Sequence, residues 1–174
     1  MSKRAGFTLI ELVLVIVILA VLSVVALPKF ISLRLDSKAA TLEAVGGAMR
    51  EGLHLVYSEA ALQNQINGNG EIDYLGVQLP VYQGYPAVDG GNSFQQLNQQ
   101  VQAWLDIDSV ALPTIIANND AAPFFVDKST ALNRIYIFFS DDLADKSVSF
   151  DCHVLYTNQE NGSGPSVTVK TTDC

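Results

Sequence analysis

Residues 7–27 read FTLIELVLVIVILAVLSVVAL, and this stretch decides the fold. Only Thr8, Glu11 and Ser23 interrupt its apolar character. As an α-helix, these 21 residues span about 31 Å, which is enough to cross a bilayer hydrocarbon core of about 30 Å. Pro28 follows, and because proline lacks an amide N–H and crowds the preceding turn, it predicts a bend there. We therefore predict that residues 7–28 form a hydrophobic membrane helix.

The flanking charges predict the orientation of this helix. Lys3 and Arg4 precede the apolar run, and no comparable basic cluster follows it closely. The positive-inside rule then keeps the first residues in the cytoplasm and sends the remainder across the membrane.

Three interpretations of the N-terminus are open at this point. A secretory signal peptide cut after Ala26 would release a secreted binding domain, but the run is longer than a typical signal core and contains Glu11. A plain membrane anchor explains the length but gives the acid no role. In the third interpretation the cut falls between Gly6 and Phe7, after a short basic leader.

The stretch G-F-T-L-I-E-L, followed by an aliphatic run and Pro28, resembles the N-terminus of type IV prepilins. The shorter stretches LPKFISL, VYSEAAL, GYPA and DCHVLYT resemble pilins of the mannose-sensitive haemagglutinin type. The resemblance implies that residues 1–6 are a leader, that a prepilin peptidase cuts after Gly6, and that the new amino terminus on Phe7 is methylated.

This cut gives Glu11 a chemical partner. It creates an α-amino group on Phe7, whose ordinary pKa of about 7.7–8.0 makes it mostly cationic at neutral pH. A buried charge without a partner is unfavourable, whereas two opposite charges compensate each other. The pair can form within one helix, because Phe7 and Glu11 are spaced i, i+4, or between neighbouring subunits, as the resemblance implies. Alternatively, Glu11 lies at the headgroup boundary.

Residues 29–62 predict an amphipathic continuation of the helix. Its apolar positions recur at intervals of three and four, which indicates one face packed on a globular domain. They are Leu42, Val45, Met49, Leu53, Val56 and Ala60. Gly46 and Gly47 interrupt this part, and we interpret them as sites of close packing rather than as a hinge.

Residues 63–174 predict the globular part, beginning with an αβ-loop region. Residues 64–76 are rich in Asn and Gly and predict a loop, and residues 77–88 predict a short strand pair or an extended connection. Ser93 and Gln96 form a capping-box pattern that starts a helix at 94–105, with Trp104 in the core.

The last third of the chain predicts β-structure. Residues 134–139 alternate in a way that predicts a strand covered on both faces, and residues 148–156 predict a half-buried strand. A turn over 157–165 leads to a third strand around 167–169. The predicted class is α+β, with a long N-terminal helix packed on an antiparallel sheet.

Cys152 and Cys174 are the two cysteines of the chain. No His/Cys cluster accompanies them, so a zinc site is not expected. In a chain that crosses a membrane, they predict one disulfide formed in an oxidising compartment. The predicted register does not pair them directly, so the bond should tack the tail back to the sheet. The resemblance to pilins implies the same bond.

The net charge and the absence of catalytic motifs argue against nucleic-acid binding and enzyme activity. A net charge of −8 leaves no basic footprint for nucleic acid, and no nucleophile–base, P-loop or zinc motif predicts an enzyme, a metal or another cofactor. The resemblance implies a major pilin that assembles from the inner membrane into an extracellular fibre for adhesion and biofilm formation. The implied partners are other copies of the chain, the prepilin peptidase, an inner-membrane platform with its ATPases, and an outer-membrane secretin. A pseudopilin of a type II secretion system is the alternative.

Overall fold

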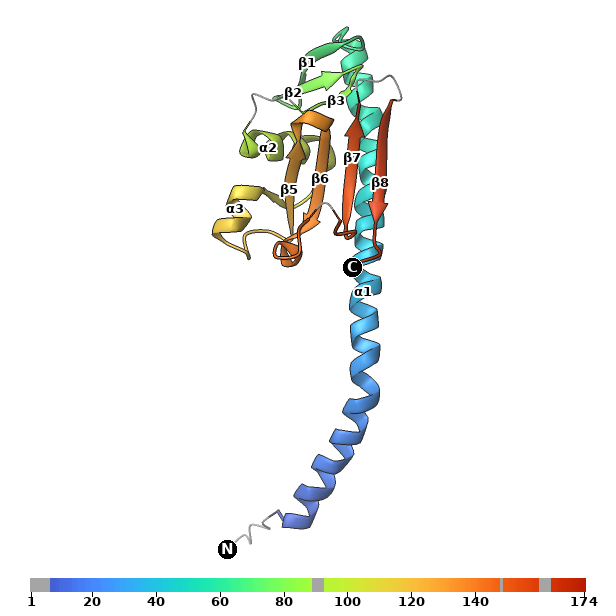
Figure 1. Cartoon of the computed structure of the whole chain (residues 1–174), viewed down its shortest axis with the longest axis vertical. Coiled ribbons are helices and arrows are strands. Elements are labelled where there is room, and N and C mark those ends of the chain that lie inside the picture. The colour runs from blue at the N-terminus through green and yellow to red at the C-terminus, as the bar shows by residue number, and fades with distance from the viewer. Residues whose placement is uncertain (1–6, 89–92, 148, 160–163) are drawn as a thin grey trace, which may run out of the picture. The chain divides into compact units, whose positions relative to one another are not determined.

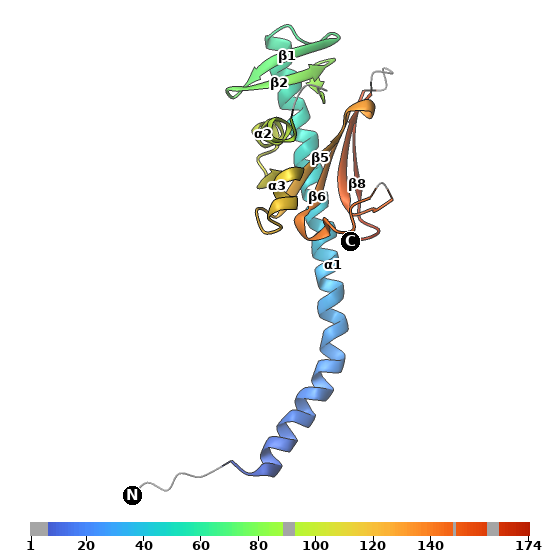
Figure 2. The same cartoon turned by 60° about the vertical axis from the view of Figure 1, so that its left-hand side comes forward.

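The structure is a computed structural model that describes residues 7–88, 93–147, 149–159 and 164–174. It divides into two compact units, residues 1–38 and residues 39–174. Within its described residues, the first unit consists of the early turns of one helix, α1. The second unit holds the later turns of α1 and the sheets shown in Figures 1 and 2.

The elements of the described residues follow one another in this order: α1 (Leu9–Leu62), β1 (Asn69–Tyr74), β2 (Val77–Tyr82), β3 (Tyr85–Pro86), α2 (Phe94–Leu105), β4 (Ser109–Ala111), α3 (Leu112–Ala117), β5 (Phe124–Ser129), η1 (Thr130–Leu132), β6 (Arg134–Phe139), η2 (Ser140–Asp142), β7 (His153–Asn158) and β8 (Pro165–Lys170). This α+β layout confirms the predicted fold class.

Helix α1 joins the two predicted helical segments into one element of 54 residues, with Pro28 inside it. In the second unit, its predicted apolar stripe is buried. Every member of the stripe, from Leu42 to Ala60, is 7 % exposed or less. Burial of one such large aliphatic side chain stabilises a fold by roughly 1.5–3 kcal/mol, so this face contributes strongly to the core.

The five-stranded sheet packs on this stripe. Val126 of β5, Ile137 of β6, and Val154 and Tyr156 of β7 all belong to the cluster of buried residues that α1 contributes to. Figure 1 shows β7 and β8 running alongside the later turns of α1. The face of the sheet that packs on α1 is called the inner face below, and the opposite one the outer face.

The glycines of α1 differ in their surroundings. A Cβ atom built on Gly46 would meet the side chain of Val169 on β8, whereas one built on Gly47 would have open space around it. The close-packing interpretation therefore holds for Gly46 and not for Gly47. Gly52, which the sequence interpretation overlooked, allows the closest approach to α2, because its Cβ would lie 2.6 Å from the carbonyl oxygen of Trp104.

The smaller sheet has the order β1–β2–β3. The prediction of a loop over residues 64–76 is wrong, because β1 forms there and pairs antiparallel with β2, from Asn69 opposite Tyr82 to Tyr74 opposite Val77. Leu75 and Gly76 turn the chain with φ of 53° and 83°. Two residues with positive φ are the geometry of a tight hairpin turn, and burial of Ile72 at 1 % exposure holds the register.

Helix α2 has the predicted bounds and the predicted capping box. The Ser93 hydroxyl accepts a hydrogen bond from the Gln96 amide at 3.2 Å, and the Gln96 side chain accepts one from the Ser93 amide at 2.8 Å. Trp104 is 5 % exposed, which confirms its place in the core. The strand pair predicted over 77–88 is present as β2 and β3.

The larger sheet has the order β4–β5–β6–β7–β8. It is antiparallel as predicted except at β4, which pairs parallel with β5. Strand β6 matches the prediction for residues 134–139. The predicted strand over 148–156 begins only at His153, because residues 149–152 lie outside the ladder, and Val148 lies outside the described residues.

The prediction that this strand is half-buried is also wrong. His153, expected on the solvent side, is 2 % exposed, because β7 lies between β6 and β8 and the rings of Tyr136 and Phe138 pack against the imidazole at 5.6 and 4.9 Å between centroids. Burial is the main cause that lowers the pKa of His153 below its ordinary value of 6.5, while a hydrogen bond with the Phe150 carbonyl opposes the shift.

We predict opposite effects of alanine at two glycines of α1. Gly52→Ala should lower the free energy of unfolding by about 1–3 kcal/mol, because the new Cβ would crowd the backbone of α2. Gly47→Ala should raise it by up to about 1 kcal/mol, because space is open and alanine favours the helix. Denaturant unfolding of the full chain in micelles, followed by Trp104 fluorescence, measures both. Equal effects of the two variants would contradict the packing described above.

We also predict a pH dependence of stability from His153. A histidine whose pKa is lowered in the folded state takes up protons preferentially when the chain unfolds. Its contribution to stability is therefore complete above pH 6.5 and falls as the pH drops below that value. His153→Gln should flatten the stability profile between about pH 5 and 7. Identical profiles for wild type and His153→Gln would exclude the effect.

Candidate functional site

The first turn of α1 contains a reciprocal cap between Thr8 and Glu11. The Glu11 carboxylate accepts hydrogen bonds from the Thr8 amide at 2.8 Å and from the Thr8 hydroxyl at 2.7 Å. The Glu11 amide in turn donates to the Thr8 hydroxyl at 3.3 Å. This arrangement satisfies amide donors that every helix leaves unpaired at its start.

The cap occupies only part of the carboxylate. Both hydrogen bonds from Thr8 end on Oε2, and within the described residues Oε1 of Glu11 receives none. A carboxylate has roughly four acceptor positions on its two oxygens, so Oε1 can still accept from a cation while the cap stays formed. Gly6, the predicted leader end, lies outside the described residues, and Phe7 is 78 % exposed.

The sequence interpretation gave Glu11 a charge-pairing role and missed the cap. The signal was present, since Thr8 and Glu11 have the T-x-x-E spacing of a capping box. The acid therefore has a local structural role in addition to the predicted one.

The early part of α1 exposes an almost unbroken apolar surface. Large apolar side chains from Leu9 to Leu35 are 44–81 % exposed. By length and composition α1 can cross a membrane. Monomeric soluble proteins rarely expose apolar patches of more than a few hundred Å², so this surface requires lipid or another protein surface as its environment.

The polar interruptions of this segment are compatible with an apolar environment. The Ser23 hydroxyl donates to the Leu19 carbonyl at 2.7 Å, so it needs no water. Pro28 lies inside α1 and has no N–H to donate to the carbonyl of Val24. The helix is therefore short of one backbone hydrogen bond at the C-terminal end of the apolar segment.

The second predicted site is the C-terminal disulfide. Cys152, which is fully buried and immediately precedes β7, is bonded to Cys174, and the two Cα atoms are 4.9 Å apart. As predicted, the bond tacks the tail beyond β8 back to the sheet. For a closed loop of this size, with a sequence separation of 22, the chain-entropy model gives a stabilisation of about 3 kcal/mol.

Polar contacts around Asp151 hold the tail next to the disulfide. The Asp151 amide donates to the Asp173 carboxylate at 2.8 Å, and the Asp173 amide donates to the Asp151 carbonyl at 3.1 Å. The Lys170 ammonium group forms an ion pair with the Asp151 carboxylate at 2.7 Å. These side chains are about one-third exposed, so the ion pair adds little stability and chiefly fixes the geometry of the tail.

Comparison with known proteins identifies the N-terminal segment. Residues 1–27 match the family described as the prokaryotic N-terminal methylation motif, which is the signature of type IV prepilins. No curated protein and no solved structure gives a significant match to the chain. The motif implies processing by a prepilin peptidase and assembly from the membrane, as for a pilin or a pilin-like precursor. The long apolar helix followed by a sheet domain is also the layout of the type IV pilin fold.

Proposed function

We propose that the chain is a major pilin, the structural subunit of a type IV pilus that serves in surface attachment. One observation carries this proposal: the prepilin signature coincides with a capped acid on an exposed apolar helix, and that helix continues into a unit with its own core. A helix of this kind can be stored in lipid and later transferred to other helices. The proposed role is therefore structural and not catalytic.

In the first step, the precursor inserts as a single-pass protein of the inner membrane. Lys3 and Arg4 keep the leader in the cytoplasm, and the sheet unit lies in the periplasm, where the disulfide can form. The prepilin peptidase then cuts after Gly6 and leaves Phe7 as a methylated amino terminus. An inner-membrane platform with its ATPases would add the subunit to the fibre, and a secretin channel would lead the fibre to the cell surface.

The geometry of Glu11 supports a charge pair between subunits. Thr8 holds Oε2 of the carboxylate in place, and Oε1 remains available for the amino terminus of an adjacent subunit. The new α-amino group is a cation at neutral pH. The pair forms only when two helices have the correct axial stagger, so it selects the register in which subunits dock. The partner group does not exist until the leader is removed, and assembly therefore follows processing.

The exposed apolar segment supplies the surface through which the helices pack together. Lateral packing of residues 7–27 replaces lipid contacts by helix contacts, as close packing does between membrane helices. The missing backbone hydrogen bond at Pro28 gives each helix a point at which it can bend between the packed segment and the sheet unit.

The disulfide favours a pilus over a secretion-system pseudopilin. Pilins commonly close their C-terminal region with two cysteines, and major pseudopilins more often use calcium there. Cys152 and Cys174 provide the covalent closure in this chain. Short stretches that resemble mannose-sensitive haemagglutinin pilins are the basis for proposing that subfamily.

The processing step gives the first prediction from this proposal. Mass spectrometry of the mature chain should show a start at N-methylated Phe7, and substitution Gly6→Val should leave the precursor uncut in the membrane. A start at Leu27 would instead identify a signal peptide, and would exclude the proposed assembly path. Immunoblotting of membrane fractions distinguishes cut from uncut chains in the same samples.

The assembly step gives the second prediction, read out as thin filaments in electron micrographs and in the sheared fraction. Deletion of the gene should remove the filaments and reduce attachment, and the wild-type gene should restore both.

Glu11→Gln keeps acceptors for the Thr8 cap but removes the charge, so it should lower filament yield about tenfold or more. Thr8→Val removes a hydroxyl of the cap but keeps the charge, and should retain most of the yield. Normal filaments from Glu11→Gln would contradict the charge pair, and loss in Thr8→Val alone would assign the role to the cap.

A further inference from the structure

The outer face of the larger sheet carries a pocket of about 300 Å³. It lies over β5 and β6, and the segment that follows η2 contributes to its wall. The residues that matter for its chemistry are Asp127, Ser129, Arg134, Tyr136 and Lys146. This set is called the outer-face pocket below. Its volume is at the lower end of the range for small-molecule sites, so it suits a single ring rather than a large ligand.

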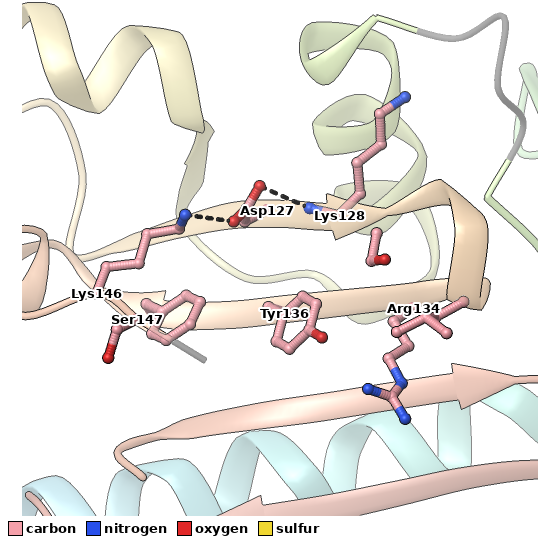
Figure 3. Close-up of a pocket in the computed structure, with 9 residues that line it drawn as sticks. Asp127, Lys128, Arg134, Tyr136, Lys146 and Ser147 are labelled. Carbon is pink, nitrogen blue, oxygen red and sulfur yellow. Dashed lines mark hydrogen bonds and ion pairs between the residues drawn. The ribbon is translucent and has the colours of Figure 1, made fainter. Parts of the chain in front are cut away.

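Two of the cations around the outer-face pocket are already engaged. Lys146 forms an ion pair with the Asp127 carboxylate at 2.7 Å. The Lys128 ammonium group lies over the ring of Phe94, 5.5 Å from its centroid. Figure 3 shows Lys146 reaching Asp127, while the Lys128 side chain points away from Arg134 and Tyr136.

Arg134 differs from these two lysines. It begins β6, it is half-buried, and its Nε atom is buried with no hydrogen-bond acceptor among the described residues. None of the described carboxylates forms an ion pair with it, although the chain has 18 acidic residues against 10 basic ones. A buried guanidinium donor favours a planar acceptor such as a carboxylate, which it binds through parallel hydrogen bonds.

An aromatic surface adjoins Arg134. Tyr136 lies two residues further along β6 and is half-buried, and its ring stacks on that of Phe138 at 6.0 Å between centroids. Phe138 stacks in turn on Phe125 at 5.3 Å. Because the Tyr136 ring is fixed by its stacking on Phe138, its exposed part offers a rigid apolar surface to a ligand ring.

Polar acceptors complete the outer-face pocket. In the register of β5 and β6, Ser129 lies opposite Arg134 and Asp127 lies opposite Tyr136. A hydroxyl and a carboxylate at these positions can accept hydrogen bonds from ligand hydroxyl groups. An aromatic acid without hydroxyl groups would bind Arg134 and Tyr136 but would make no contact with these acceptors, and a free phosphate would make no contact with the Tyr136 ring. A pyranose that carries a carboxylate can contact Arg134 through that carboxylate, Tyr136 through its ring, and Ser129 and Asp127 through its hydroxyl groups.

We propose that the outer-face pocket binds a uronic acid residue of an acidic polysaccharide. Arg134 holds the sugar carboxylate, Tyr136 stacks on the pyranose ring, and Ser129 and Asp127 accept from its hydroxyl groups. This inference does not rest on the proposed function, because every residue of the pocket lies in the sheet unit and the binding needs no assembly.

The test is calorimetric titration of the full chain in an uncharged polyoxyethylene detergent, which contains no sugar. The probes are a tetrasaccharide of galacturonic acid and a neutral tetrasaccharide of galactose. We expect binding of the acidic probe, weakened by salt, and about tenfold or more weaker binding of the neutral one. Arg134→Met should lower the affinity for the acidic probe about tenfold or more. Arg134→Lys keeps the charge but loses the planar guanidinium group, so its affinity for the acidic probe should lie between those of the wild type and Arg134→Met.

Arg50→Met is the matched control. It removes the same charge from an exposed position of α1 that does not line the pocket, and should leave the affinity unchanged. Trp104 fluorescence verifies that each variant is folded. No binding by the wild type, equal binding of the two probes, or equal loss in Arg50→Met and Arg134→Met would each overturn the proposal. So would a change of oligomeric state in Arg134→Met without any sugar binding, which would identify a carboxylate of a second copy as the occupant.

Discussion

A change in the distribution of apolar side chains along α1 is the constraint on which the rest of the structure depends. Over its early turns the helix is apolar all round, and nothing in its own unit covers it. Beyond Lys38 the apolar residues narrow to one stripe, and this stripe is the surface on which the sheets assemble. The early turns of the helix therefore need an apolar environment, whereas its later turns bury one apolar face against the sheets. The rest of the sequence serves to cover the stripe.

Glu11 connects this constraint with function. A carboxylate in the apolar segment needs donors, and Thr8 supplies two of them from the preceding turn. The cap supplies hydrogen bonds to the Glu11 carboxylate in the precursor and leaves Oε1 for a further partner. The local structure thus stabilises a charge whose proposed role begins only later, when a neighbouring chain brings a cation to it. Neither role excludes the other, because they use different oxygens of one group.

Sequence periodicity predicted the elements whose apolar side chains follow a regular helical or alternating pattern. The stripe of α1, helix α2 with its capping box, and strand β6 were predicted with their observed bounds or close to them. The errors arose where contacts distant in sequence decide the structure. Strand β1 lies in a segment rich in Asn and Gly, and its pairing with β2 outweighs that composition.

The errors in β7 and the missed role of Arg134 have the same origin. The disulfide and the contacts of Asp151 hold residues 149–152 outside the ladder, so the strand starts later than its alternation suggests. His153 alternates as a solvent-facing residue would, but the rings of β6 pack against it and bury it. The chemistry of Arg134 depends on which acids are absent from its surroundings, and no spacing in the sequence expresses that.

The two edges of the larger sheet are secured in different ways. Strand β8 follows β7 in the chain, and beyond β8 the disulfide links the tail to Cys152, so β7, β8 and the tail lie within one covalently closed loop. Strand β4 has three residues and pairs with a single neighbour. The covalent closure limits how far β8 can move from the sheet, whereas β4 is held by hydrogen bonds and side-chain packing alone. Local opening of the sheet therefore starts at β4, and the half of the sheet next to α1 is the last to lose its structure.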